Sequence, residues 1–318
     1  MKLGLFGINV GAGTTPQRAH STAVLAEELG LESLWALDHV VMPSGYETKY
    51  PYHESGKMMG GAEEVDIADP LTWLTFAAAV TDRIKLGTGV IILPQRNPVV
   101  LAKQAASLDV LSGGRLLLGV GVGWLAEEFA AVGVPWADRG RRHDDYIEAM
   151  RALWRDTKAS VHNTYTDFDN AISLPQPAGG AVPIVIGGRS NRSARRAAAI
   201  GDGYFPSITE PDQLSPLLDI MNSEAQRLHR DPTDIEVTVP YPGDPAELTA
   251  AAHGDTAALE RITALLQGFA DSGVSRTLLA GVADEALPPL LKHLGDRVER
   301  NCQYLWIGVF QATSVPAC

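Results

Sequence analysis

An Asp-His pair that follows a short apolar segment is the first candidate for chemistry. Asp38 and His39 come directly after the apolar residues 33–37. A histidine can exchange a proton near neutral pH, which suits general acid or base catalysis. The alternative is structural: Asp38 caps a loop and His39 makes an ordinary hydrogen bond. No His-x-His or His-Glu-x-x-His pattern accompanies the pair, so the sequence predicts no metal site.

Glycines interrupt an apolar strand pattern at residues 86–90, which read Leu-Gly-Thr-Gly-Val. A glycine inside a strand marks a bulge, or the close approach of a ligand or of another part of the backbone. Thr88, Gly89 and Val90 are therefore candidate ligand contacts. Tight packing at the rim of the fold is the alternative.

A second glycine run occupies residues 119–124, ends at Trp124 and is followed by Glu127-Glu128-Phe129. Its third glycine falls one residue early for a dinucleotide-binding fingerprint, and the run does not belong to the first strand-helix-strand unit, so we reject a Rossmann fold. Exposed backbone at Gly121 beside Trp124 suits a flat ring ligand. Core packing of Trp124 is equally consistent with the sequence.

A third segment, Gly187-Gly188-Arg189-Ser190, immediately precedes a predicted helix. Free backbone N–H groups and the positive end of a helix favour a phosphate at such a turn. Four nearby arginines add positive charge to this region of an acidic chain: Arg189, Arg192, Arg195 and Arg196. Solvated surface arginines are the alternative interpretation.

The elements that must position these residues alternate between short apolar strands and helices of 3.6-residue period, a pattern typical of a parallel sheet covered by helices. Eight strands are predicted, which favours a closed (β/α)8 TIM barrel in a single domain over residues 1–300. Two segments depart from the alternation: residues 40–69 after strand 2, and a hairpin at 160–181 before strand 5. We expect insertions of this length to be lids or substrate walls. The strands are expected near residues 2–8, 33–37, 84–92, 115–120, 183–187, 203–206, 235–240 and 276–279.

The composition excludes several classes of protein. The 318 residues are 45% hydrophobic and carry a net charge of −12, so the chain has a large core and no basic footprint for nucleic acid. No apolar run approaches the roughly 18 residues of a membrane span, and the N-terminus lacks a signal-peptide pattern, so we expect a cytoplasmic protein. The two cysteines, Cys302 and Cys318, form no disulfide framework or cysteine-rich metal site.

Taken together, the segments are more specific than any one of them alone. The order 33–39, 86–90, 97–115 and 119–124, continued by Gly187-Gly188 and the Gly-Asp-Gly-Tyr of 201–204, resembles the bacterial luciferase-like monooxygenase superfamily. Within it, the chain is most similar to actinobacterial F420-dependent oxidoreductases. The resemblance covers about residues 1–240, and residues 301–318 match nothing in it and form a tail of unclear role.

The resemblance implies a barrel whose C-terminal mouth holds the ring of the deazaflavin F420 or, alternatively, of FMN. It implies a non-proline cis peptide at Gly89–Val90 behind the ring, with His39 near the reactive edge as acid or base and Asp38 as the neighbour that orients it. Gly187, Gly188, Arg189 and Ser190 match the region that receives the cofactor phosphate. Sugar-phosphate dehydrogenases of the superfamily have a carboxylate at the position of Trp124, so sugar-phosphate oxidation is disfavoured.

The leading hypothesis is an F420-dependent oxidoreductase that transfers hydride between the deazaflavin and a small organic substrate. The runner-up is an FMN-dependent monooxygenase that activates oxygen and is served by a separate flavin or F420 reductase. A non-catalytic flavin-binding protein is a third reading, since a fold alone does not guarantee chemistry. Membership of the family also implies a homodimer.

Overall fold

The strands form a closed parallel barrel. The computed structural model describes residues 1–207 and 210–301. The sheet runs in the order β3-β2-β1-β11-β10-β9-β8-β5-β4, and a further pairing between β3 and β5 closes it. The eight-stranded barrel predicted from the sequence is confirmed, with its third strand divided into β3 and β4. The strand segments are β1 (Lys2–Phe6), β2 (Ser33–Ala36), β3 (Lys85–Thr88), β4 (Ile91–Ile92), β5 (Leu116–Gly121), β8 (Ile184–Gly187), β9 (Gly203–Phe205), β10 (Glu236–Pro240) and β11 (Arg276–Ala280).

The third barrel strand differs from its prediction because it is split in two. Residues 84–92 were expected as one strand, but β3 ends at Thr88 and β4 begins at Ile91. The peptide bond between Gly89 and Val90 is cis, as the resemblance implied. β3 pairs with the start of β5, and β4 pairs with its end.

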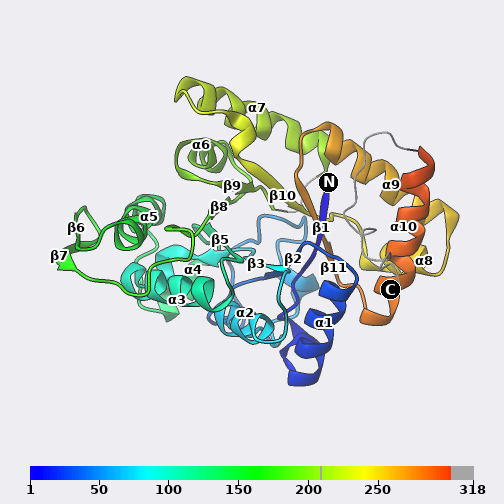
Figure 1. The fold of residues 1–318 in the computed structure, drawn as a ribbon, viewed down its shortest axis with the longest axis horizontal. Helices are drawn as coiled ribbons and strands as arrows, with labels where there is room; N and C mark the ends of the chain where they lie inside the picture. The colour runs from blue at the N-terminus through cyan, green and yellow to red at the C-terminus, as the bar shows by residue number, and fades with distance from the viewer. Residues whose placement is uncertain (208–209, 302–318) are drawn as a thin grey trace, which may run out of the picture.

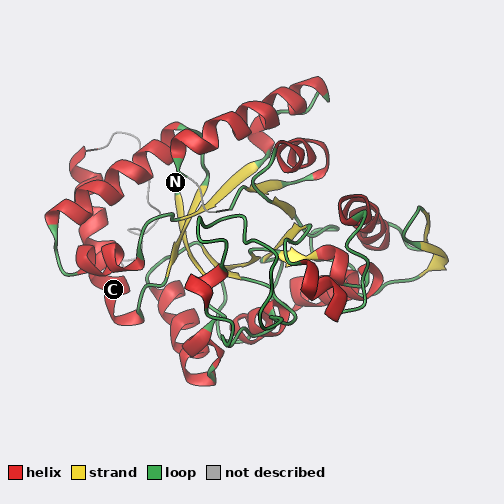
Figure 2. Ribbon diagram, turned by 180° about the vertical axis from the view of Figure 1, so that it is seen from behind, coloured by secondary structure: helices red, strands yellow, loops and turns green. Residues whose placement is uncertain are grey.

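Helices surround the barrel, as Figures 1 and 2 show. Capping side chains followed by proline start several of them: Asp69 accepts a hydrogen bond from the Thr72 N–H, and Asn97 does the same for Val99. The helices are α1 (Pro16–Glu28), α2 (Pro70–Ala78), α3 (Pro98–Leu111), α4 (Ala126–Ala131), α5 (Arg139–Arg155), α6 (Asn191–Ile200), α7 (Pro211–Arg227), α8 (Pro245–Ala252), α9 (Thr256–Asp271) and α10 (Leu287–Asn301).

Two of these helices, α4 and α8, were not predicted. Both are short, with 6 and 8 residues, so neither contains enough turns for its hydrophobic period to stand out. The predicted tail at 301–318 lies outside the described residues except for Asn301, the last residue of α10.

The core has two layers. The larger packs the outward faces of the strands against the helices. The smaller fills the barrel with Trp35, Val185, Phe205 and Leu278, and Phe6, Val90 and Leu117 pack against it. The inner cluster blocks the barrel, so a ligand can enter only the space above it.

The predicted hairpin before strand 5 is present as β6 (Ala159–His162) paired antiparallel with β7 (Asp167–Ala171). It projects beside α5, at the left edge of the view in Figure 1. None of its residues lines the pocket described below. This hairpin therefore forms no part of the wall of that pocket, whereas residues of the 40–69 insertion do.

Candidate active site at the mouth of the barrel

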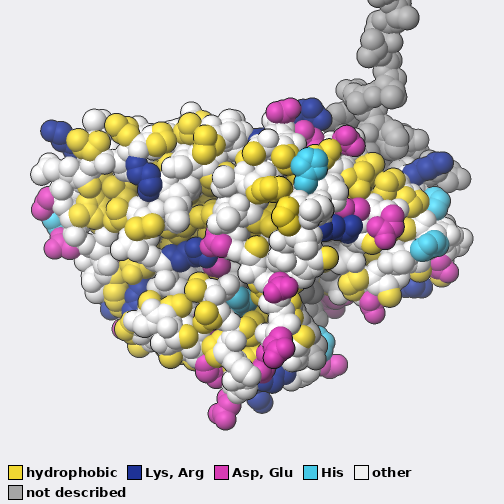
Figure 3. All heavy atoms as spheres, turned by 90° about the horizontal axis from the view of Figure 1, so that it is seen from below, with side chains coloured by type: hydrophobic (Ala, Val, Ile, Leu, Met, Phe, Trp, Pro, Cys, Tyr) yellow, Lys and Arg dark blue, Asp and Glu magenta, His cyan; other side chains and the backbone are white. Residues whose placement is uncertain are grey.

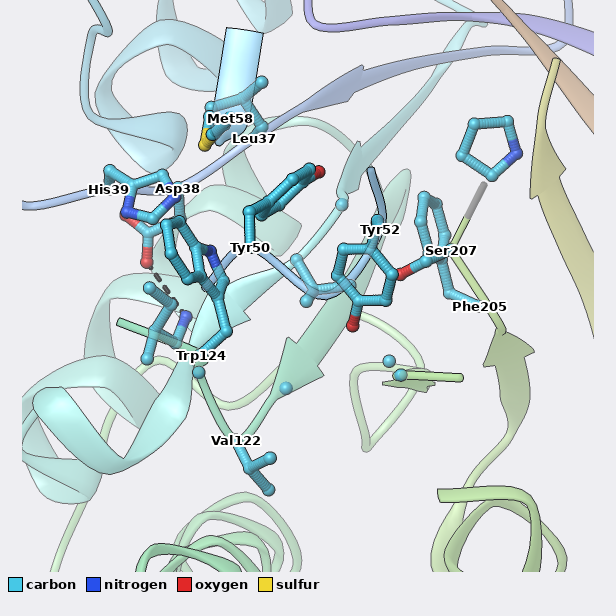
Figure 4. A pocket seen from close by; sticks show the side chains of 18 of the residues that line it. Leu37, Asp38, His39, Tyr50, Tyr52, Met58, Val122, Trp124, Phe205 and Ser207 are labelled. Atoms are coloured by element: carbon cyan, nitrogen blue, oxygen red, sulfur yellow. Dashed lines mark hydrogen bonds between the residues drawn. The ribbon is translucent and has the colours of Figure 1, made fainter. Parts of the chain in front are cut away.

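A pocket of about 410 Å³ opens at the carboxyl ends of the barrel strands. Active sites of such barrels are built at this end. The residues after β2, β3, β5 and β8 contribute to its wall together with the 40–69 insertion (Figure 4). Most of the lining side chains are aromatic or aliphatic, including Phe6, Leu37, Tyr50, Tyr52, Met58, Val90, Ile92, Val122, Trp124 and Phe205.

His39 lines this pocket and is held by a buried carboxylate. Its Nδ1 lies 3.0 Å from Oε2 of Glu128. The His39 side chain is 6% exposed and that of Glu128 is 0% exposed. The other oxygen of Glu128 accepts a hydrogen bond of 2.7 Å from the Val40 N–H. One carboxylate therefore fixes both the imidazole ring and the backbone that follows it.

Asp38 also lines the pocket, but its carboxylate bonds elsewhere. Arg96 donates to Asp38 Oδ1 at 2.7 Å, and the Ile92 N–H donates to Oδ2 at 3.0 Å. Burial raises the pKa of Asp38 above its usual value, although Arg96 and the Ile92 N–H oppose the shift. The orienting role that the resemblance gave to Asp38 thus belongs to Glu128, and Asp38 instead joins the strand end to β4.

The floor of the pocket is the side chain of Val90, which follows the cis peptide. A Cβ at Gly121 or Gly187 would lie 2.8 Å from Val90 Cγ2. Both glycines are therefore required by the close approach of the Val90 side chain. Gly89 faces Phe6 and Phe205, so the whole floor is apolar.

Three candidate contacts, Thr88, Arg189 and Ser190, do not line the pocket. Thr88 is fully buried and donates its hydroxyl to the Gly119 carbonyl at 2.7 Å, so its side chain is committed to the adjacent strand. Ser190 caps α6: its Oγ accepts the Ser193 N–H at 3.1 Å, and its own N–H donates to Ser193 Oγ at 2.9 Å. Gly187 and Gly188, by contrast, lie in the pocket wall.

Arg189 is exposed and contacts the 40–69 insertion. Its Nη2 donates to the Pro51 carbonyl at 3.2 Å, and its guanidinium lies 5.6 Å from the centre of the Tyr52 ring. Of the neighbouring arginines, Arg196 is paired with Asp144 on α5. The arginines near α6 therefore make different contacts, and Arg189 contacts the 40–69 insertion.

Aromatic side chains build the wall between His39 and the insertion. Trp124 meets the His39 ring edge-on at 5.8 Å and the Tyr50 ring at 5.0 Å, and Figure 4 shows it between them. Tyr46 packs on Trp124 from behind at 5.5 Å. Burial raises the pKa of Tyr50 to about 12, so its hydroxyl remains neutral and can donate a hydrogen bond.

Side chains to which the sequence analysis gave no role hold the insertion against the barrel. Asn9 is fully buried and donates to the carbonyls of Leu37 and Ala68, joining the two ends of the insertion. Glu127 accepts hydrogen bonds from the backbone N–H groups of Glu47 and Thr48. The sequence feature that could have identified Glu127 and Glu128 is their position beside the glycine run at a strand end. For Asn9 the only such feature is its position after the first strand.

Within residues 1–207 and 210–301, no group of three His, Cys, Asp or Glu side chains is placed to hold a metal ion. In the same residues, no helix has the length and apolar character needed to cross a membrane.

The model of the luciferase-like monooxygenase family matches residues 1–299. The chain belongs to this family. An uncharacterized protein of Mycobacterium tuberculosis is 32% identical over 266 residues, which are 82% of this chain and 81% of that protein. Relatives that are named for a cofactor fall into two groups.

The F420-dependent glucose-6-phosphate dehydrogenase of Beutenbergia cavernae is 30% identical over 74% of this chain and 68% of its own. The FMNH2-dependent dimethylsulfone monooxygenase of Pseudomonas putida is 28% identical over 64% of this chain and 52% of its own. Among solved structures, monooxygenase RslO1 from Streptomyces bottropensis has the same fold, with a TM-score of 0.72 and 22% identity over 93% of this chain and 99% of that one. Relatives of this chain thus use F420 or FMN.

Proposed function

We propose that this protein is an F420-dependent oxidoreductase that moves hydride between the deazaflavin ring and a small organic substrate. The observation that carries the proposal is His39, held by a buried carboxylate at the edge of an apolar pocket whose floor is Val90. An imidazole in this position can exchange a proton with a substrate oxygen or nitrogen. Hydride chemistry on such substrates requires that exchange.

The residues fit a flat tricyclic ring. The pocket volume of 410 Å³ falls within the range of about 300–1,000 Å³ that is usual for small-molecule sites. Val90, Phe6 and Phe205 offer an apolar surface for one face of the ring, while Trp124 and Tyr50 stand at its side. When bound, the deazaflavin would accept or donate the hydride.

The protein's own groups would orient the reactants and exclude water. Tyr50 and Tyr52 of the insertion cover the pocket, and Gly188 leaves backbone exposed beside α6. The positive end of α6 and the exposed arginines 192 and 195 would attract the phosphate and the acidic tail of F420. His39 would exchange the substrate proton.

A binding titration of the purified apo-protein with F420 and, in parallel, with FMN tests the proposal. Tight binding of F420 with little response to FMN is the expected result. A preference for FMN would replace the proposal with the FMN-dependent monooxygenase, for which oxygen consumption with a separate reductase is the next assay. Failure to bind either would reject both.

The His39→Ala variant tests the role of the histidine. We expect turnover to fall by about 10²-fold or more, the usual contribution of an acid or base, while F420 affinity changes little. Steady-state kinetics and the same titration measure the two quantities. Unchanged turnover would remove the acid or base role.

We also propose that the protein is a homodimer that associates through α2 and α3. These adjacent helices expose Phe76, Val99, Val100, Val110 and Leu111, and Val100 and Leu111 are 55% and 74% exposed. Lys103 is the one exposed charged side chain in these two fully described helices. Figure 3 shows the molecule from below, the side on which α2 lies in Figure 1, and hydrophobic side chains cover broad areas of this face. In a chain of net charge −12, such a face lets two copies meet without repulsion.

Sedimentation velocity of the Val100→Glu variant tests this interface. We expect the variant to dissociate to monomers at concentrations where the wild type is a dimer. Leu228→Glu is the control, because Leu228 is 40% exposed at the end of α7, away from α2 and α3. Equal behaviour of the two variants would place the interface elsewhere.

A further inference from the structure

Glu128 is a fully buried carboxylate between the pocket and the start of the insertion. Its Oε1 accepts the backbone N–H groups of Val40 at 2.7 Å and Val41 at 3.4 Å. Its Oε2 lies 3.0 Å from His39 Nδ1. Glu128 itself does not line the pocket, so it acts only through the residues that it holds.

The chemistry of these partners decides which nitrogen of His39 carries the proton. A backbone N–H can only donate, and an ionised carboxylate can only accept. Glu128 therefore presents an acceptor to Nδ1, and neutral His39 carries its hydrogen on that atom. The lone pair is then on Nε2, which has no hydrogen-bond partner among the residues that the structure describes.

We propose that Glu128 is a positioning residue that fixes His39 in the Nδ1–H form, so that Nε2 can accept a proton from the substrate. This inference rests on the proposed function, because it assigns the proton exchange to one atom of His39. For an alcohol substrate, Nε2 would take the O–H proton, and the electron pair left on oxygen would form the carbonyl. The bound deazaflavin would supply the acceptor for the hydride of the broken C–H bond.

The neighbouring Glu127 provides a matched control. Its carboxylate accepts hydrogen bonds from the N–H groups of Glu47 and Thr48, at 2.8 and 3.0 Å, and from the Thr48 hydroxyl at 2.6 Å. It therefore anchors the same insertion from the same helix but does not touch His39. A change that only loosens the insertion would appear in both Glu127→Gln and Glu128→Gln.

The experiment measures the tautomer of His39 by long-range ¹H–¹⁵N correlation in apo-protein with labelled histidine, read on the neutral form of the imidazole. The His39→Gln variant assigns the signals. In Glu128→Gln the amide oxygen can still accept the Val40 N–H, but the amide NH2 then faces Nδ1. We expect Nδ1–H in the wild type and in Glu127→Gln, and Nε2–H in Glu128→Gln.

Nε2–H in the wild type, or the same tautomer in wild type and Glu128→Gln, would overturn the inference. If Glu128→Gln does not fold, the wild-type tautomer alone decides, with Nδ1–H expected. For the folded variant we also expect kcat to fall by about 10²-fold with a smaller change in KM. Because the tautomer is read without cofactor, its failure is distinct from failure of F420 binding.

Discussion

At the scale of single residues, Val90 explains several glycines at once. Its side chain occupies the space that a Cβ would fill at Gly121 and at Gly187, on two different strands. A valine that projects across the barrel in this way can form a floor only if its neighbours have no side chains. The glycines are therefore part of the pocket although their own atoms contribute little surface.

The Gly187→Ala variant tests this explanation. The new Cβ would lie 2.8 and 2.9 Å from the two Val90 methyl groups, so Val90 must move toward the pocket. We expect a loss of stability of about 1–3 kcal/mol, typical of overpacking, and at least about tenfold weaker cofactor binding. Thermal unfolding and the F420 titration measure these effects.

Gly179→Ala is the matched control for this substitution. The nearest atom to a Cβ there is the Ala181 carbonyl oxygen at 4.0 Å, so no neighbour has to move. Equal effects of the two substitutions would show that Val90 does not determine the shape of the floor.

At the scale of elements, the first part of the insertion, residues 40–51, is held against the barrel at three places. Glu128 binds its first residues, Glu127 binds Glu47 and Thr48, and Arg189 binds the Pro51 carbonyl from the other side of the pocket. Hydrogen bonds from the Thr48 hydroxyl and from backbone N–H groups lower the pKa of Glu127 to about 2. That anchor is therefore complete above the ordinary glutamate pKa of 4.5 and is lost only as the pH falls toward 2.

The Arg189→Ala variant tests the contact across the pocket. We expect faster amide hydrogen exchange over residues 49–56, because the tip of the insertion loses its bond to the turn before α6, and a higher KM for substrate. Hydrogen-exchange mass spectrometry measures the first effect. Arg192→Ala, which removes an exposed arginine of the first turn of α6, should leave exchange in this segment unchanged. Unaltered exchange in Arg189→Ala would mean that this part of the insertion is held without Arg189.

At the scale of the whole molecule, one end of the barrel holds the pocket and the other end has a structural role. The end opposite the pocket is closed by Arg276, which is 2% exposed and binds Glu32 at 2.6 Å and Glu236 at 3.0 Å. Burial of Glu32 opposes its ionisation, but the hydrogen bond and charge of Arg276 outweigh this and lower its pKa. This cluster joins β2, β10 and β11 far from the chemistry.

The Arg276→Met variant tests the structural role of this cluster. Removal of Arg276 leaves Glu32 without the guanidinium that binds it, whereas Glu236 keeps its ion pair with Lys2. We therefore expect the free energy of unfolding to fall by about 3 kcal/mol near neutral pH. Because the pKa of Glu32 is lowered in the folded protein, the stabilisation is present above 4.5 and is lost as the pH falls below it. Denaturant unfolding at several pH values should show the difference between variant and wild type shrinking in acid. A constant difference would contradict the role assigned to the carboxylates.

The sequence by itself determined the barrel, because strand and helix periods are local and are repeated along the chain. It also placed His39, Trp124 and Gly188 at strand ends, which a parallel barrel brings to one mouth. The cis peptide at Gly89–Val90 followed from the family resemblance. Short elements such as α4 carried too few residues to be recognised.

Only the tertiary structure decided what each polar group binds. Asp38 is adjacent to His39 in sequence, yet successive side chains at a strand end point in different directions, and Asp38 binds Arg96 instead. The carboxylate that holds His39 comes from Glu128, which lies 89 residues further along the chain. Hydrogen bonds between side chains depend on distances that are set by the closing of the barrel and the packing of the insertion, and no local pattern in the sequence encodes them.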